Sequence, residues 1–192
     1  MAEEAELLYE FARRGKLAEV RALLDKGVPP DRHMGYDGSA SLAMAARGGH
    51  AEVVKLLLER RASLDMHTDD GSAPLMHAVS GKSPEAVRAL LEAGADPSEQ
   101  NEDGVTPLIL AADLGNLQVT QLLVAARADV AVIAEDWGSA LDSAAASGHD
   151  EIVAFLAAHG GRAATEEEIN TQRKVAAGEQ WGYDAFDGEE DY

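Results

Sequence analysis

Three observations predict an all-α fold, a solenoid of stacked helix-turn-helix units. A leucine column recurs every 33 residues, at Leu42, Leu75, Leu108 and Leu141. A glycine column seven residues later keeps this period at Gly49, Gly115 and Gly148, and the remaining unit carries Lys82 there. Apolar residues make up 46% of the chain but aromatic residues only 5%, so the core is mostly Ala, Leu and Val, which suits closely packed helices. A fixed period of this length is typical of a repeat array.

Each unit is expected to contain two short helices joined by a tight turn. In the unit at 101–133, Thr106 can cap the first helix, and Pro107 stands at its first position, where the missing N–H costs nothing. Gly115 ends this helix, and the run QVTQLLV then gathers branched apolar residues on one face of the second helix. No unit can bury that face alone, so the units must stack. Ala-Ala pairs at 45–46, 111–112 and 144–145 let neighbouring helices approach closely.

The recurring segments are LLYEFARRGKLAEVRALLDKGVPPD (7–31), DGSASLAMAARGGHAEVVKLLLERRASLD (37–65), DGSAPLMHAVSGKSPEAVRALLEAGADP (70–97), DGVTPLILAADLGNLQVTQLLVAARADV (103–130) and DWGSALDSAAASGHDEIVAFLAAHGG (136–161). They resemble the ankyrin repeat. The resemblance implies an ankyrin-repeat solenoid of about five repeats over residues 4–161, with β-turns or hairpins as loop tips. We expect a domain at 1–163 with units at about 4–34, 35–67, 68–100, 101–133 and 134–161.

The sequence departs from the family's Thr-Pro-Leu-His motif. The corresponding tetrads are ASLA (40–43), APLM (73–76), TPLI (106–109) and SALD (139–142). The histidine is missing from all four, and the threonine remains only at Thr106, with Ser139 as a substitute. The resemblance implies a hydrogen bond between that Thr and His in each unit, so its loss should leave these units individually weaker.

In the last unit Trp137 takes the column of Gly38, Gly71 and Gly104, where a bulky aromatic residue needs a reason. Two interpretations stay open. An exposed tryptophan is a common interface anchor. Alternatively, Trp137 folds back on the C-terminal segment and seals the end of the stack, whose outer face must be covered.

No sixth repeat follows in register. Residues 165–178 predict a C-terminal capping helix within 164–178, because Thr165 and Glu168 have capping-box spacing and Gly178 supplies a stop. The segment 179–192 interleaves acids with aromatic residues, which are Trp181, Tyr183, Phe186 and Tyr192. Three interpretations of this tail stay open: a linear motif that docks on a basic, apolar groove, a strap on the array itself, or a disordered extension without function.

Composition excludes several classes of function. The chain has no cysteine, so a disulfide framework, a thiolate nucleophile and a Cys-based zinc site are excluded. A net charge of −19 argues against binding to nucleic acid or to an anionic membrane surface. The acidic N-terminus lacks the features of a secretory signal, and the longest apolar run is too short to span a bilayer. We expect an intracellular protein, cytoplasmic or nuclear.

The search for chemistry gives no site, so we expect no enzyme, no cofactor and no metal. His50 and His149 begin second helices and are expected to serve structure, and His77 is expected to be half-buried in a first helix. His67 lies near Asp65, Asp69 and Asp70 without metal-ligand spacing. No phosphate-binding loop or nucleophile elbow is present, and Ser80, Ser143 and Ser147 have no evident base and acid companions.

The resemblance implies that a partner meets the turn tips, the concave side and the exposed ends of the first helices, where Asp113 is expected to lie. The residues in those columns are Tyr36, Asp37, Ser39, Arg47, Asp69, Asp70, Ser72, Ser80, Glu102, Asp103, Val105, Asp113, Leu114, Glu135, Asp136, Trp137, Gly138 and Ala146. This surface is acidic, with Tyr36, Leu114 and Trp137 as apolar anchors. The alternative is that the acidity only keeps the chain soluble.

We therefore expect a non-enzymatic protein–protein interaction module, an adaptor, assembly factor or chaperone, that binds a basic protein segment. Two other functions stay open: an inhibitor that occludes the groove of an enzyme, and a constitutive structural subunit of a large complex. The chain is expected to be monomeric on its own or a subunit of a hetero-complex.

Amide hydrogen exchange tests a local weakness. Arg61 and Arg127 occupy the column of Gly27, Gly94 and Gly160, which close the second helices. A non-glycine residue in a left-handed cap costs on the order of 1 kcal/mol, so the turns at the two arginines should exchange faster than those at Gly94 and Gly160. Equal protection at all four turns would contradict this.

Overall fold

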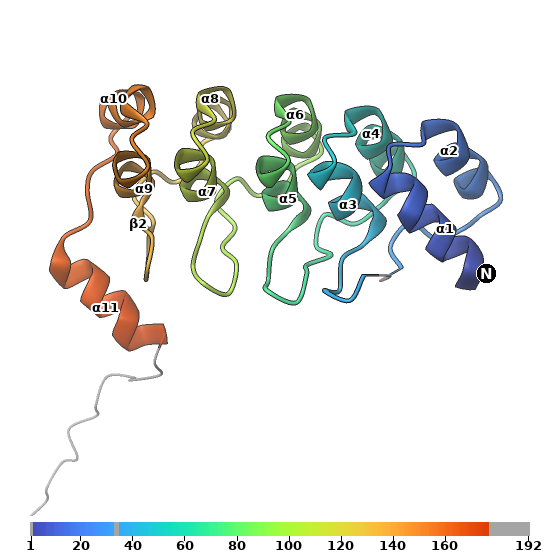
Figure 1. The fold of residues 1–192 in the computed structure, drawn as a ribbon, viewed down its shortest axis with the longest axis horizontal. Helices are drawn as coiled ribbons and strands as arrows, with labels where there is room; N and C mark the ends of the chain where they lie inside the picture. The colour runs from blue at the N-terminus through green and yellow to red at the C-terminus, as the bar shows by residue number, and fades with distance from the viewer. Residues whose placement is uncertain (1, 33–34, 177–192) are drawn as a thin grey trace, which may run out of the picture.

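The structure is a computed structural model that describes residues 2–32 and 35–176, and these residues form a row of helical pairs (Figure 1). Within them the pairs are α1 (Ala2–Arg13) with α2 (Leu17–Asp25), α3 (Ser41–Arg47) with α4 (Ala51–Glu59), α5 (Pro74–Ser80) with α6 (Pro84–Glu92), α7 (Pro107–Asp113) with α8 (Leu117–Ala125), and α9 (Ala140–Ala146) with α10 (Asp150–Ala158). The second helices form one layer, the first helices form another, and the loop tips project below the first helices (Figure 1). The predicted all-α solenoid is confirmed.

The leucine column lies at the centre of the core. Leu42, Leu75 and Leu108 are each 1% exposed, whereas Leu141 is half-buried because its unit is the last helical pair among the described residues. The alanine pairs that follow the leucines in the same helices, at 45–46 and 111–112, are fully buried. Small side chains at these positions let each first helix pack directly on the next.

The predicted helix starts are present. The Thr106 side chain accepts a hydrogen bond from Ile109 N at 3.3 Å, and Pro107 is the first residue of α7. Ser139 forms a full capping box with Asp142, in which each side chain accepts a bond from the backbone N–H of the other residue. Ser139 therefore replaces threonine as a cap, as the sequence predicts.

The loop tips span 35–39, 68–72, 101–105 and 134–138, and each is closed between its first and last residues. The first three are turns, closed by backbone bonds such as Thr68 N to Ser72 O (3.1 Å) and Asn101 N to Val105 O (3.1 Å). The fourth tip is a hairpin, in which β1 (Ile133–Ala134) pairs antiparallel with β2 (Gly138–Ser139) and Ala134 faces Gly138. Both kinds of tip that the resemblance implied are present.

The helix predicted after the last unit is α11 (Glu166–Ala176). Thr165 and Glu168 form its capping box: Thr165 N donates to Glu168 Oε2 at 2.8 Å, and Glu168 N donates to Thr165 Oγ1 at 3.3 Å. The expected Gly178 stop lies outside the described residues. Instead of covering the outer faces of α9 and α10, as a capping helix would, α11 lies on the tip side and packs against β1 (Figure 1).

Arg61 and Arg127 adopt the left-handed conformation that the repeat requires, with φ of 64° and 67°. Lys82, in the column that ends the first helices, has φ of 53°. Glycines in the arginine column, Gly27 and Gly94, have open space where a Cβ would lie. A side chain in this column therefore meets no steric clash, and the arginines destabilise the fold only through their left-handed backbone conformation.

Replacing Arg61 or Arg127 by Gly should raise the free energy of unfolding by about 1 kcal/mol, because the backbone strain is relieved. Urea unfolding measures this. Lys82→Gly is the matched control. The Lys82 side chain donates a hydrogen bond to Leu114 O at 3.2 Å, so this variant loses that bond together with the backbone strain. Its free energy of unfolding should therefore rise by less than that of the arginine variants. A stabilisation of all three variants by the same amount would contradict this account.

Candidate partner-binding surface

The predicted contact residues fall into two sets: the four loop tips, which project below the first helices (Figure 1), and the C-terminal ends of those helices. We call the four tips, residues 35–39, 68–72, 101–105 and 134–138, the tip surface. Its acids occupy the second and third positions of the tips: Asp37, Asp69, Asp70, Glu102, Asp103, Glu135 and Asp136. All are exposed except Glu135, which is half-buried, and Tyr36 beside them is fully exposed.

Two of these carboxylates hold their own tips together. Asp37 accepts a hydrogen bond from Ser39 N at 3.1 Å, and the Ser39 side chain and backbone together lower the pKa of Asp37. Asp70 accepts bonds from Ser72 N (3.1 Å), Ser72 Oγ (3.0 Å) and Thr68 Oγ1 (2.5 Å). Burial works to raise the pKa of Asp70, but these bonds outweigh it and the pKa is lowered. Both groups are therefore structural as well as exposed.

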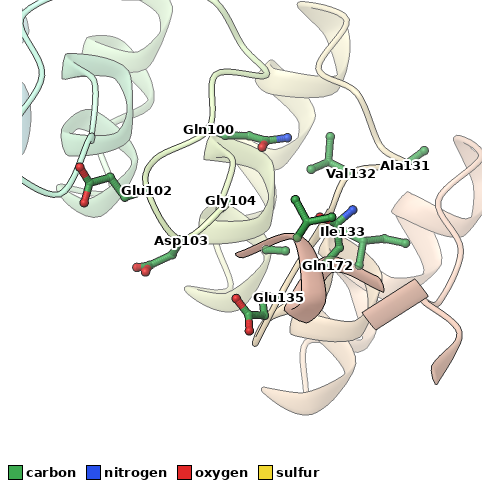
Figure 2. Close-up of a pocket in the computed structure, with 11 residues that line it drawn as sticks. Gln100, Glu102, Asp103, Gly104, Ala131, Val132, Ile133, Glu135 and Gln172 are labelled. Atoms are coloured by element: carbon green, nitrogen blue, oxygen red, sulfur yellow. The ribbon is translucent and has the colours of Figure 1, made fainter. Parts of the chain in front are cut away.

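Neighbouring tips are joined by backbone bonds at the first two junctions. Asp69 N donates to Asp37 O at 2.8 Å, and Glu102 N donates to Asp70 O at 3.1 Å. The equivalent atoms at the third junction, Glu135 N and Asp103 O, make no hydrogen bond within the described part of the chain. A hollow of about 430 Å³ lies there instead, between the third tip, β1 and α11 (Figure 2).

The fourth tip explains how a tryptophan fits a glycine column. Gly138, one residue after Trp137, has φ of +68°, so the left-handed residue of this tip has shifted by one position. Trp137 itself has no positive φ. Its side chain is 38% exposed, and its carbonyl accepts a hydrogen bond from Ser143 Oγ at 3.0 Å. The hairpin thus accommodates the large side chain without strain.

The ends of the first helices contribute less than the sequence suggests. Arg47 and Ala146 are exposed, as is Ser80, whose hydroxyl bonds to Met76 O. The expectation that Asp113 lies on an exposed helix end is wrong: it is half-buried, and its carboxylate accepts a bond from Ser147 Oγ at 2.8 Å in the next unit. Leu114 is also half-buried and packs against the core.

His77 forms a buried cluster that the sequence analysis did not find. It was expected to be half-buried, but it is only 8% exposed, and its Nε2 lies 3.3 Å from Thr68 Oγ1. The tetrad alignment hid this pair, because His77 stands one residue after APLM and its partner lies nine residues before it. A Thr–His link therefore survives in this unit in another register.

This cluster is not arranged for catalysis. In a nucleophilic triad the histidine lies between the hydroxyl and the carboxylate, but here the Thr68 hydroxyl lies between His77 and Asp70. Thr68 is 6% exposed, which also keeps a substrate away from the hydroxyl. The arrangement instead ties the second tip to α5.

The other histidines have structural partners. His50 Nε2 lies 3.1 Å from Arg13 O and His149 Nε2 lies 2.9 Å from Asp113 O, so each links its unit to the one before, as expected of structural residues. His67 Nε2 lies 2.6 Å from Glu99 Oε1 of the next unit. Among residues 2–32 and 35–176, no group of three or more His, Cys, Asp or Glu side chains is placed to hold a metal ion.

Two further features bear on binding. The predicted tail motif, Trp181, Tyr183, Phe186 and Tyr192, lies outside the described residues. None of the described helices has the length and apolar character needed to cross a bilayer.

Comparison with known proteins identifies the repeat. A family model described as ankyrin repeats (3 copies) matches residues 8–101 and again residues 75–166. The two matches together run from the middle of α1 to the start of α11. No curated protein matches the chain.

Stability should depend on pH through His77. Burial, reinforced by the charge of Arg47, lowers the pKa of His77 from its ordinary value of 6.5, although Asp70 and Asp37 partly oppose this. As the pH falls below 6.5, the unfolded chain gains a proton at this residue before the folded chain does. The contribution of His77 to the free energy of unfolding is therefore complete above pH 6.5 and is lost as the pH falls toward its pKa in the folded state.

The free energy of unfolding should accordingly fall between about pH 7 and about pH 5, and His77 should contribute at most about 1.4 kcal/mol per pH unit. Urea unfolding of the wild type and of His77→Gln at both pH values measures this. The variant is expected to be less stable at neutral pH and to lose less stability on acidification. Parallel pH dependences would show that His77 does not carry the effect.

Proposed function

The chain belongs to the ankyrin repeat family, whose repeats generally mediate protein–protein interactions and are typically non-enzymatic, and from this premise we propose that it is an adaptor, assembly factor or chaperone that binds a basic protein segment. The segment lies along the tip surface. Its lysine and arginine side chains meet the row of carboxylates, while Tyr36 and Trp137 supply apolar contact.

The observation that carries this proposal is a set of acids without neutralising partners. The carboxylates of Glu102, Asp103 and Glu135 accept no hydrogen bond and form no ion pair within the described residues. Asp136 has one cation nearby, Arg173 of α11, at 3.4 Å. A concentrated negative surface of this kind favours and accelerates encounter with a cationic partner.

Charge reversal on the third tip tests the proposal. The probe is fluorescein-labelled nona-arginine, titrated against the full chain. The double variant Glu102→Lys and Asp103→Lys should slow association by about tenfold at low salt, because both positions are exposed and act mainly through the field they create. Asp70 stays unchanged because it holds its own tip. Stopped-flow fluorescence at about 50 mM and about 300 mM NaCl gives the rates and their salt dependence.

The matched control is the double variant Glu59→Lys and Glu92→Lys. It changes the net charge equally, but both residues are exposed in the last turns of α4 and α6, on the layer opposite the tips (Figure 1). Lysine is favoured in the last turn of a helix, so the control should fold. Equal slowing by both double variants would mean that net charge alone attracts the peptide. Binding that does not weaken with salt would favour a structural subunit with an apolar interface.

A further inference from the structure

The hollow at the third junction arises because two inter-unit links of the second junction have no counterpart there. At the second junction, Glu102 N bonds to Asp70 O and His67 bonds to Glu99. One repeat further on, the first pair becomes Glu135 N and Asp103 O, which are not bonded to each other. The second pair becomes Gln100 and Val132, and a valine side chain cannot accept a hydrogen bond. Gln100 and Val132 both line the hollow that results.

The hollow has an apolar wall and an acidic rim. Val132, Ile133 and Val175 of α11 form the apolar part, and the Val175 side chain is 61% exposed, so this surface meets water. The preceding repeats carry polar or flexible residues in the columns of Val132 and Ile133: Met66, His67, Glu99 and Gln100. Glu102, Asp103 and Glu135 also line the hollow, but Figure 2 shows the side chains of Glu102 and Asp103 directed away from Val132 and Ile133, toward the second tip.

We propose that this hollow is the anchor site of the basic partner and receives one arginine side chain of the bound segment. The inference rests on the function proposed above and adds the place and the residue type. The methylene groups of the arginine pack on Val132, Ile133 and Val175, while the guanidinium meets the carboxylate of Glu135 and the backbone carbonyl of Asp103, which accepts no bond from the described residues.

Arginine fits better than the alternatives. A guanidinium has five donors in a planar fork, which suits several acceptors around one hollow, whereas the ammonium of lysine is a compact and strongly hydrated point charge. The chain's own tail offers aromatic side chains, but residues 179–192 contain six acids and no lysine or arginine. Their charge opposes entry into a hollow already lined by three acids.

Methyl NMR locates the bound peptide, because the chain has four isoleucines. Ile133 lines the hollow, Ile109 and Ile152 are buried in the core, and Ile169 lies on α11. The full chain, labelled at isoleucine δ1 methyl groups and assigned with Ile133→Val, is titrated with nona-arginine, nona-lysine and nona-citrulline. Nona-arginine should shift the Ile133 signal strongly and those of Ile109 and Ile152 little. At equal saturation nona-lysine should shift Ile133 less, and the neutral peptide should leave it in place.

A matched pair of variants on α11 tests the site by affinity. Val175→Lys places a cation in the hollow, and Asn170→Lys adds the same charge at an exposed position of the same helix outside it. The first should weaken nona-arginine binding by about tenfold and the second by less than about twofold. Val175 is largely exposed, so its replacement should leave the fold intact.

The outcomes separate this inference from the proposed function. If nona-arginine binds with the expected salt dependence but Ile133 does not shift and the two lysine variants weaken binding equally, the anchor site is wrong and the acidic tip surface stands. If nona-arginine does not bind at all, both fail. If Trp181→Ala with Tyr183→Ala in the full chain shifts Ile133 without peptide, the chain's own tail occupies the hollow and the anchor proposal fails.

Discussion

The packing of the first helices against one another is the constraint on which the rest of the structure depends. A single helical pair cannot cover its own apolar face, so each unit needs its neighbours. The buried leucine column and the alanine pairs set how closely the first helices approach. Each tip is connected directly to a first helix, so this packing also brings the tips side by side. The contact between Gly115 and the His149 ring reinforces the spacing, since a Cβ on Gly115 would lie 2.4 Å from that ring.

The sequence was sufficient to predict the features that depend on a single position of the repeat and its immediate neighbours in the chain. The leucine period, the caps at Thr106 and Ser139, the left-handed arginines and the capping box of α11 each depend on local chemistry, and each could be predicted. The buried pair of His77 and Thr68 could not be predicted, because it joins two positions of the repeat that do not correspond to the Thr and His of the family's motif. The hollow could not be predicted either, since it results from the loss of two links that only the structure of the preceding junction reveals.

The acids of the tip surface divide into two groups. The carboxylates of Asp37 and Asp70 accept bonds within their own tips and are held there in their charged form. Those of Glu102, Asp103 and Glu135 have no such partner among the described residues, so their repulsion is relieved only by solvent. Position in the repeat does not separate these groups: Asp37, Asp70 and Asp103 share one column. The separation comes from the serines at 39 and 72, which are replaced by Val105 in the third tip.

The end of the array shows why α11 is available at the tip surface. A solenoid must keep its last outer face compatible with water, and a covering helix is one solution. Here the last unit instead carries small side chains on that face. Ala157 stands where the preceding units carry Leu58, Leu91 and Val124. Ala145 is exposed, whereas its equivalent in the preceding unit, Ala112, is buried. Exposing alanine costs much less than exposing leucine, because the hydrophobic term follows the apolar area left in water. The end face therefore does not need α11 as a cover, and this helix can lie against β1 as a wall of the hollow beside the acidic tips.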